Sequence, residues 1–285
     1  MPKSNLTIGA DPEFFLYSQT HDRIVPSCGL LGGTKEEPMA LGRRGYFVQE
    51  DNVMAEYNIP PCPTGDKFGS CITKGRDLVL AHARERSGDD SLVAFRGTYA
   101  ELSPDMLQHP GAMRFGCSPD FDAYQMGQPC PPIDPDRLTG NNGVLRFAGG
   151  HVHLGYNLPE IPPQVVAMFC DLMLGAYAIA YGLDRQGPRR QWYGTPGRYR
   201  PTPYGIEYRT LGNHWTLDTH SAIVIGRRAL MTLRFLQNAN KETIREMYME
   251  TPWTALREAI QSESESDCLK ILEGATERML AEQAA

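Results

Sequence analysis

The chain has 285 residues, of which 41% are hydrophobic and 22% charged, a composition typical of a globular protein with a substantial core. Acidic residues (34) outnumber Lys and Arg (28), so direct nucleic-acid binding over a broad basic face is not expected. The seven cysteines contain no Cys-x-x-Cys pair, which disfavours a zinc or redox centre.

The sequence also predicts a cytoplasmic location. The first residues lack the apolar run of a signal peptide. Asp171 interrupts the most apolar segment, residues 165–183, so we expect no membrane span.

Residue patterns predict a single domain, 1–285, with a sheet-rich part over about 6–215 and a helical part over about 219–285. Strands are expected within residues 6–17, 46–58, 92–99, 114–117, 144–154 and 205–211, with a possible break at Asp51. Helices are expected from a cap at Thr64 or Asp66 to Ser87, and over residues 165–181, 222–236, 241–249, 253–260 and about 267–283. The turn-rich segment 118–135 is a candidate lid or specificity loop.

Polar residues two positions apart share one face of a strand, and such pairs recur along the predicted strands. The pairs are Asp11 with Glu13, Glu56 with Asn58, His151 with His153, and Glu207 with Arg209. A lone His-x-His pair is equally explained by a polar strand face in water. Several buried carboxylates with imidazole and guanidinium groups are unfavourable unless cations join them, so the set together predicts a Mg²⁺ or Mn²⁺ site.

The segment 187–203 is basic and aromatic in an otherwise acidic protein. It contains Arg189, Arg190, Trp192, Tyr193, Arg198 and Arg200. It is either a solvated loop or a local cationic site. Metals beside arginines favour phosphoryl transfer.

These motifs resemble a known family in their order along the chain. Residues 9–16 (GADPEFFL) resemble the first metal-binding strand of glutamine synthetase and glutamate-cysteine ligase, and residues 149–155 (GGHVHLG) resemble their Gly-x-His-x-His strand. Residues 50–60 (EDNVMAEYNIP) and 207–213 (EYRTLGN) more closely resemble the phage-associated type 2 carboxylate-amine ligases. The resemblance implies an α+β, glutamine synthetase-like domain whose curved, mainly antiparallel sheet has a metal-lined concave face and outer helices.

The resemblance also implies ATP-dependent amide formation through an acyl phosphate, with two or more Mg²⁺ or Mn²⁺ ions. The implied metal ligands are Asp11, Glu13, Glu50, Glu56, His151 and Glu207. The implied catalytic residues are Arg209, Arg200, Glu50 and His153, and the nucleotide-binding residues are Arg200, Arg209, His153, Asn58 and Tyr193. The family pattern assigns His151 to the metal and His153 to the phosphate or substrate side.

The sequence differs from the family pattern in two respects, and it leaves two alternative functions open. Asp11 is shorter than the usual glutamate, and the separate N-terminal domain of glutamine synthetase is missing, so a site shared between subunits of a homo-oligomer is not implied. One alternative is a cupin-like oxygenase or hydrolase that uses His151, His153 and a Glu. The other is a non-catalytic binding or virion protein. The carboxylate and amine substrates, small molecule or peptide, are not indicated.

Overall fold

A computed structural model describes residues 6–113, 120–131 and 145–284. These residues form a mixed α+β structure with antiparallel sheets, in agreement with the predicted fold class. The strand expected at 114–117 and residues 118, 119 and 132–135 of the candidate lid lie outside the described residues.

The described strands are short, and they divide several of the predicted segments. Their bounds are β1 Thr7–Ala10, β2 Glu13–Phe14, β3 Leu16–Ser18, β4 Arg23–Val25, β5 Met39–Ala40, β6 Phe47–Asp51, β7 Met54–Asn58, β8 Leu92–Ala94, β9 Tyr99–Glu101, β10 Phe121–Asp122, β11 Gln128–Pro129, β12 Leu145–Phe147, β13 Val152–Gly155, β14 Arg198–Thr202 and β15 Gly205–Tyr208.

Within the described residues, the main sheet has six strands in the order β1-β13-β15-β14-β10-β11. A second sheet has the order β2-β7-β6-β5, and smaller sheets pair β4-β3-β8 and β12-β9. The strand predicted at residues 6–17 is therefore three strands in three sheets. Pro12 separates β1 from β2 and cannot donate a backbone hydrogen bond, so the chain passes from the main sheet to the second sheet at Asp11 and Pro12.

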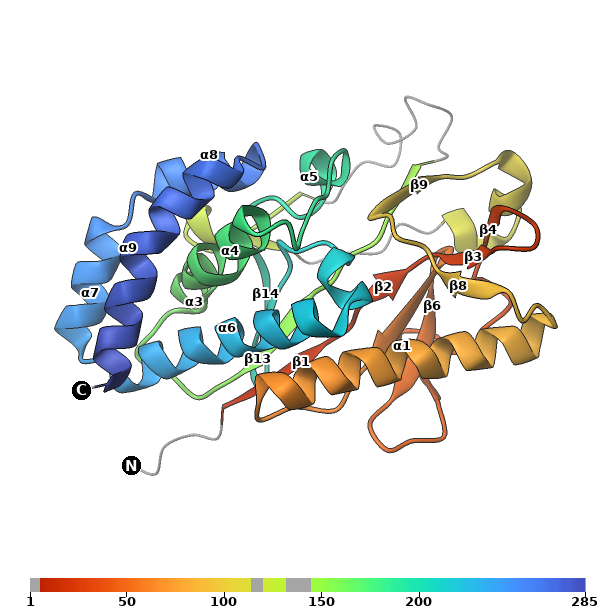
Figure 1. The fold of residues 1–285 in the computed structure, drawn as a ribbon, viewed down its shortest axis with the longest axis horizontal. Coiled ribbons are helices and arrows are strands. Elements are labelled where there is room, and N and C mark those ends of the chain that lie inside the picture. The colour runs from red at the N-terminus through yellow and green to blue at the C-terminus, as the bar shows by residue number, and fades with distance from the viewer. Residues whose placement is uncertain (1–5, 114–119, 132–144, 285) are drawn as a thin grey trace.

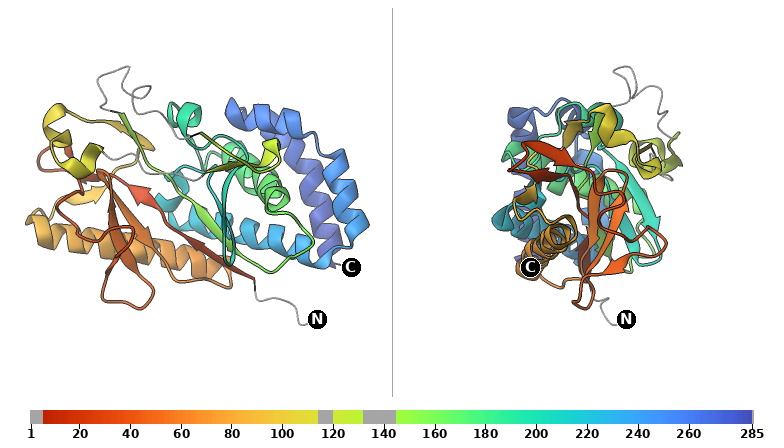
Figure 2. Two further views of the ribbon diagram at one scale, coloured as in Figure 1. Left: turned by 180° about the vertical axis from the view of Figure 1, so that it is seen from behind. Right: turned by 90° about the vertical axis from the view of Figure 1, so that its right-hand side faces the viewer.

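The helices have the bounds α1 Gly65–Ser87, α3 Pro163–Cys170, α4 Ala176–Ala180, α5 Arg189–Trp192, α6 Thr219–Asn238, α7 Lys241–Glu250, α8 Trp253–Gln261 and α9 Glu265–Ala284. The long helices α1 and α6 lie side by side in front of the strands in Figure 1, and the view from behind in Figure 2 shows the strands in front of them. The helices therefore cover one side of the sheets.

Local signals set the ends of α1, as the sequence predicted. The Thr64 side chain accepts a hydrogen bond from the backbone N–H of Lys67, which satisfies one free donor of the first turn. Gly88 ends the helix with a left-handed backbone, φ 70°. The contact between α1 and α6 depends on small residues, because a Cβ added at Gly69 would lie 2.4 Å from a side-chain carbon of Ile223.

The apolar segment Pro163–Ala180 is long and apolar enough to cross a membrane by length and composition, contrary to the prediction from Asp171. However, 72% of it is buried inside the protein, where α3, a π-helical turn at Asp171–Gly175 and α4 form a core helix. Asp171 is fully buried and accepts hydrogen bonds from the hydroxyls of Tyr208 and Thr210. The segment is therefore a core element.

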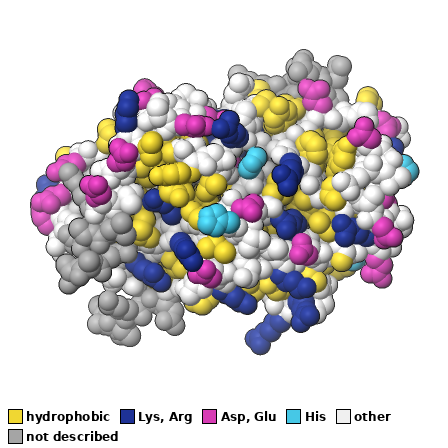
Figure 3. Space-filling view, viewed as in Figure 1, with side chains coloured by type: hydrophobic (Ala, Val, Ile, Leu, Met, Phe, Trp, Pro, Cys, Tyr) yellow, Lys and Arg dark blue, Asp and Glu magenta, His cyan; other side chains and the backbone are white. Residues whose placement is uncertain are grey.

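The surface viewed in Figure 3 mixes acidic and basic side chains with small apolar areas. The polar groups that the sequence singled out instead lie largely inside the protein. Asp11, Glu13, His151, Glu207 and Arg209 are all less than 7% exposed. Burial of so much charge requires a specific arrangement of partners.

Candidate metal centre

The register of the main sheet aligns three polar residues in one row. Arg200 on β14 pairs with Glu207 on β15, and Glu207 pairs with His153 on β13. The next residue in the row is Gly9 on β1, opposite His153, and Asp11 follows two residues later. The register therefore brings His153 next to the segment of chain that leads from β1 into Asp11.

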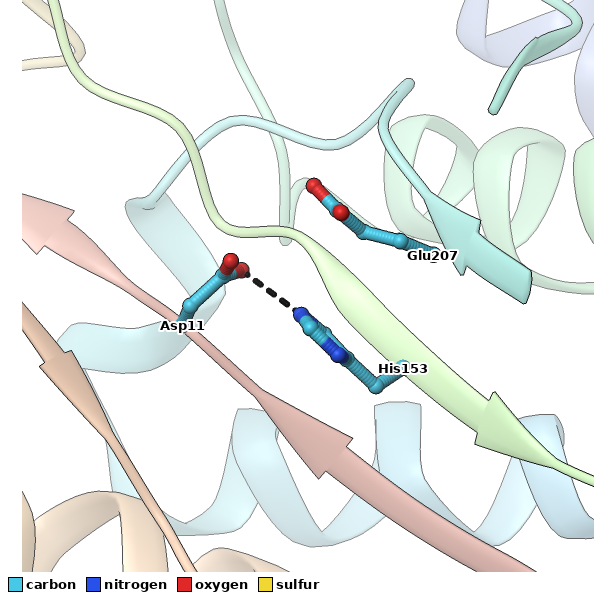
Figure 4. A group of neighbouring side chains, drawn as sticks. All are labelled: Asp11, His153 and Glu207. Carbon is cyan, nitrogen blue, oxygen red and sulfur yellow. Dashed lines mark ion pairs between the residues drawn. The ribbon is translucent and has the colours of Figure 1, made fainter. Parts of the chain in front are cut away.

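Asp11, His153 and Glu207 form the first ligand group. One ligand atom from each lies within 4.8 Å of the other two, and Figure 4 shows the three side chains converging from three strand segments. His153 Nε2 is 3.1 Å from Asp11 Oδ1. Both atoms are buried and, apart from this contact, neither has a hydrogen-bond partner among the described residues, so two atoms that can ligate a cation face the same space.

Electrostatics couple the members of the first group. Burial opposes ionisation of Asp11, but the charge of His153, together with the hydrogen bonds and charge supplied by the two histidines, more than offsets this and lowers the pKa of Asp11 below its usual range. Burial likewise opposes the charge of His153, and Asp11 nevertheless raises the pKa of His153. Each group therefore stabilises the charged form of the other.

Two arginines hold Glu207. Arg200 Nε donates to Glu207 Oε2 at 2.7 Å, and Arg209 Nη1 donates to Oε1 at 2.8 Å. Arg209 Nε also lies 3.6 Å from Asp120 Oδ1, a carboxylate that the sequence gave no reason to select. Arg200 and Arg209 are thus adjacent to the first group, as their motif predicted, and each is anchored through Glu207.

His151 lies behind this group, immediately before β13. Its Nδ1 is 3.5 Å from Asp11 Oδ1 and 3.3 Å from Glu207 Oε1. Burial and the nearby Arg209 guanidinium lower the pKa of His151. His153 therefore belongs to the ligand group, while His151, the predicted ligand, contacts both carboxylates of that group.

A second ligand group contains only carboxylates. Oxygen atoms of Glu13, Asp51 and Glu56 lie within 4.8 Å of one another. Glu13 on β2 is the direct cross-strand partner of Glu56 on β7, and Asp51 ends β6 beside them. Strand pairing therefore forces three like charges together.

The like charges and their burial shift the pKa values of the second group upward. Burial and the neighbouring Asp51 raise the pKa of Glu13 to about 8. Burial raises the pKa of Asp51 to about 6 and, with Asp11, raises that of Glu56 well above its usual range. Without a cation, the three carboxylates cannot all ionise readily at neutral pH.

Specific hydrogen bonds fix the carboxylates of the second group. Glu13 Oε2 accepts from the backbone N–H of Gly149 at 2.6 Å, and the Glu13 N–H donates to the Gly149 carbonyl at 2.9 Å. Gln49 Nε2 donates to Glu56 Oε2 at 2.8 Å. The second group is therefore attached directly to the glycines that precede the histidine strand.

The structure places Glu50 outside both ligand groups, and Asp51 lies in the second group instead. Residues 52 and 53 form a two-residue turn, so Gln49 rather than Glu50 pairs with Glu56, and Glu50 faces the opposite side with Ala55. The Glu50 carboxylate accepts hydrogen bonds from the backbone N–H groups of Gly29 and Gly32, at 2.9 and 2.7 Å. It holds a loop and does not join the ligand group.

The two remaining predicted residues lie outside both groups. Asn58 ends β7 opposite Phe47, two residues beyond Glu56. The ring of Tyr193 packs against Phe147, with 5.6 Å between the ring centroids. Neither residue is a member of the two ligand groups.

Arg189 is buried and lies near the second group. The sequence analysis identified it only as a member of the cationic segment 187–203. Its positive charge lowers the pKa of Glu13 and so partly offsets the effect of burial. Arg189 donates to the side-chain oxygen of Gln186, whose own amide donates to Asp184. Asp184 also pairs with Arg190 at 3.2 Å, so Arg190 points into this network.

The donor set fits a hard divalent cation. The first group offers two carboxylates and one imidazole, and the second offers three carboxylates, which suits the oxygen preference of Mg²⁺ and Mn²⁺. A cation would also neutralise the buried like charges.

Comparison with known proteins gave no relative: no protein-family model and no curated protein matches the chain.

Proposed function

We propose that the protein is an ATP-dependent carboxylate-amine ligase with a glutamine synthetase-like fold. The observation that carries the proposal is the adjacency of the two ligand groups. Asp11 belongs to the first and Glu13 to the second, so one three-residue segment joins them where the main sheet gives way to the second sheet. Arginines lie beside the first group, which is the combination that phosphoryl transfer needs.

Asp11, His153 and Glu207 would hold one Mg²⁺ or Mn²⁺, and Glu13, Asp51 and Glu56 a second. Such cations neutralise phosphate oxygens and so favour nucleophilic attack on ATP. This set replaces Glu50 with Asp51 and His151 with His153 relative to the residues expected from the family pattern. All of these side chains come from one chain, so the ligand set needs no second subunit.

The proposed reaction has two steps. A carboxylate oxygen of the substrate forms a bond to the γ-phosphorus of ATP, and the bond to the bridging oxygen breaks, giving an acyl phosphate and ADP. The amine nitrogen then attacks the acyl carbon, the C–O bond to phosphate breaks, and the amine loses a proton. Arg209 and Arg200, held by Glu207, would stabilise the charge on the transferring phosphoryl group.

The cupin-like alternative is less well supported, because it needs both histidines with one Glu. The first group instead combines a single imidazole, His153, with two carboxylates. Soft or redox metals prefer more nitrogen donors than this.

We also propose a cytoplasmic location for the ligase, which for a phage protein is the host cytoplasm.

Hydroxylamine provides a direct test, because it replaces the unknown amine and converts an acyl phosphate into a stable hydroxamate. The protein is incubated with ATP, Mg²⁺ or Mn²⁺, hydroxylamine and pools of carboxylic acids or peptides, and ADP and hydroxamate are measured. The proposal predicts both products in equal amounts, and their loss in Glu13→Gln. Mn²⁺ binding without any ATP binding would instead support the non-catalytic alternative.

A further inference from the structure

A tyrosine on an exposed turn contacts the half-buried histidine of the first ligand group. Tyr204 lies between β14 and β15 and is 47% exposed, yet its hydroxyl is 2.5 Å from His153 Nδ1. The two rings are stacked, with centroids 5.9 Å apart and an interplanar angle of 20°. The contact therefore constrains both the orientation of the imidazole and the position of its proton.

The turn that carries Tyr204 is fixed against β13. The Tyr204 carbonyl accepts a hydrogen bond from the backbone N–H of Tyr156 at 2.8 Å. At the next residue, a Cβ added to Gly205 would lie 2.1 Å from the Leu154 carbonyl oxygen, and its φ is +150°. Only glycine allows the turn to approach β13 this closely. The turn in this position carries the Tyr204 ring to His153.

We infer that Tyr204 is a positioning residue that accepts a hydrogen bond from His153 Nδ1–H and thereby keeps Nε2 as a ligand atom for the divalent cation. Nε2 faces Asp11 Oδ1 at 3.1 Å and, apart from this contact, has no hydrogen-bond partner among the described residues. A proton on Nδ1 leaves the Nε2 lone pair directed at this space. Partners of this kind commonly fix the tautomer of a metal-binding histidine.

This inference rests on the proposed metal role of the first group, so the test separates the two. Tyr204→Phe keeps the ring that stacks on His153 and removes only the hydroxyl. Tyr156→Phe is the matched control, because its buried hydroxyl has no hydrogen-bond partner among the described residues. Nitrogen-15 NMR of labelled histidine gives the tautomer of metal-free His153, assigned with His153→Gln, and calorimetry gives the Mn²⁺ affinity.

The inference predicts that His153, at a pH where its imidazole is neutral, carries its proton on Nδ1 in the unsubstituted protein and in Tyr156→Phe, and populates both tautomers in Tyr204→Phe. The Mn²⁺ affinity should fall about 10- to 100-fold in Tyr204→Phe alone, with unchanged melting temperatures. A proton on Nε2 in the unsubstituted protein, or an unchanged tautomer in Tyr204→Phe, would overturn it. If the unsubstituted protein keeps Nδ1–H but binds no Mn²⁺, the proposed metal site fails while the effect of Tyr204 on the tautomer stands.

Discussion

Glu13 and Glu56 are direct cross-strand partners, so two carboxylates face each other across the first pair of β2 and β7. Like charges in this position destabilise an antiparallel pair. Asp51 adds a third carboxylate within 4.8 Å. A divalent cation bound by these carboxylates, as proposed above, would offset the repulsion.

Glu56→Gln should have opposite effects on stability and on metal binding. Loss of one buried carboxylate relieves repulsion, so the melting temperature of the metal-free protein should rise. The Mn²⁺ affinity of the second group should fall by about 100-fold or more, because a direct ligand contributes at least as much as an outer contact. Thermal unfolding with and without Mn²⁺ measures both effects. A variant that is less stable without metal and binds Mn²⁺ normally would show that Glu56 is structural.

The stability of the metal-free protein should depend on pH through Glu13 and Asp51. Their pKa values in the folded protein, about 8 and about 6, exceed the ordinary values of 4.5 and 3.8, so the folded state binds more protons than the unfolded state. The free energy of unfolding should therefore decrease as the pH rises from about 4 to about 8. Denaturant titrations across this range test the sign.

Metal binding should reverse this trend, because the cation competes with protons for the same oxygens. The increase in melting temperature caused by Mn²⁺ should be larger at pH 8 than at pH 6. Glu13→Gln should reduce the pH dependence in both conditions. A metal effect that is independent of pH would argue against Glu13 as a ligand.

Asp51→Asn and Glu50→Gln form a matched pair that separates neighbouring acids on opposite faces of β6. Asp51→Asn should weaken Mn²⁺ binding at the second group, since the carboxylate lies within its ligand set. Glu50→Gln should leave the Mn²⁺ affinity unchanged and lower stability, because Glu50 accepts two backbone hydrogen bonds from the loop at Gly29 and Gly32. Calorimetry and thermal unfolding of both variants make the comparison. The reverse result would restore Glu50 to the site.

The helices were predictable because their signals are local. The cap at Thr64, the glycine at position 88 and the periodic apolar residues between them all lie within one short segment. The pair Asp11 and Glu13 was also visible from its spacing. However, that spacing alone could not show that Pro12 divides the two residues between different sheets.

The choice between Glu50 and Asp51 required the turn geometry. Strand parity is conserved only along an uninterrupted strand, and a two-residue turn changes which residues share a face. Asn52 adopts a left-handed backbone, φ 61°, in the two-residue turn of this hairpin. As a result, the odd-numbered residues Gln49 and Asp51 of β6 share a face with the even-numbered Glu56 of β7, and Glu50 lies on the other face. The contacts of Arg189 and Asp120 depend on segments far apart in the sequence, and no local pattern indicates them.

Arg209→Ala should lower turnover in the proposed ligase reaction by about two to three orders of magnitude, as for other fixed groups that stabilise developing charge. The loss of ATP affinity should be modest. Arg209→Lys should restore little, because an ammonium group cannot reproduce the paired donors that contact Glu207 and face Asp120. Steady-state kinetics and ATP calorimetry separate the two effects. Near-normal turnover in the alanine variant would show that Arg209 serves only to pair with Glu207.

His151 and His153 should differ when each is replaced by alanine, in the opposite sense to the family pattern. His153→Ala removes the Nε2 atom that lies in the first ligand group, so the Mn²⁺ occupancy of that group should fall sharply. His151→Ala removes a ring whose Nδ1 lies between Asp11 and Glu207, so the metal should remain while turnover or KM changes.

Anomalous scattering from Mn²⁺ in crystals of the two variants decides between the histidines, because it locates each ion separately. Retention of the first ion in His153→Ala and its loss in His151→Ala would return the metal role to His151. Equal, small effects of both substitutions would mean that the two rings only fill a polar strand face. The second ion, bound by carboxylates alone, should persist in both variants and serves as the internal control.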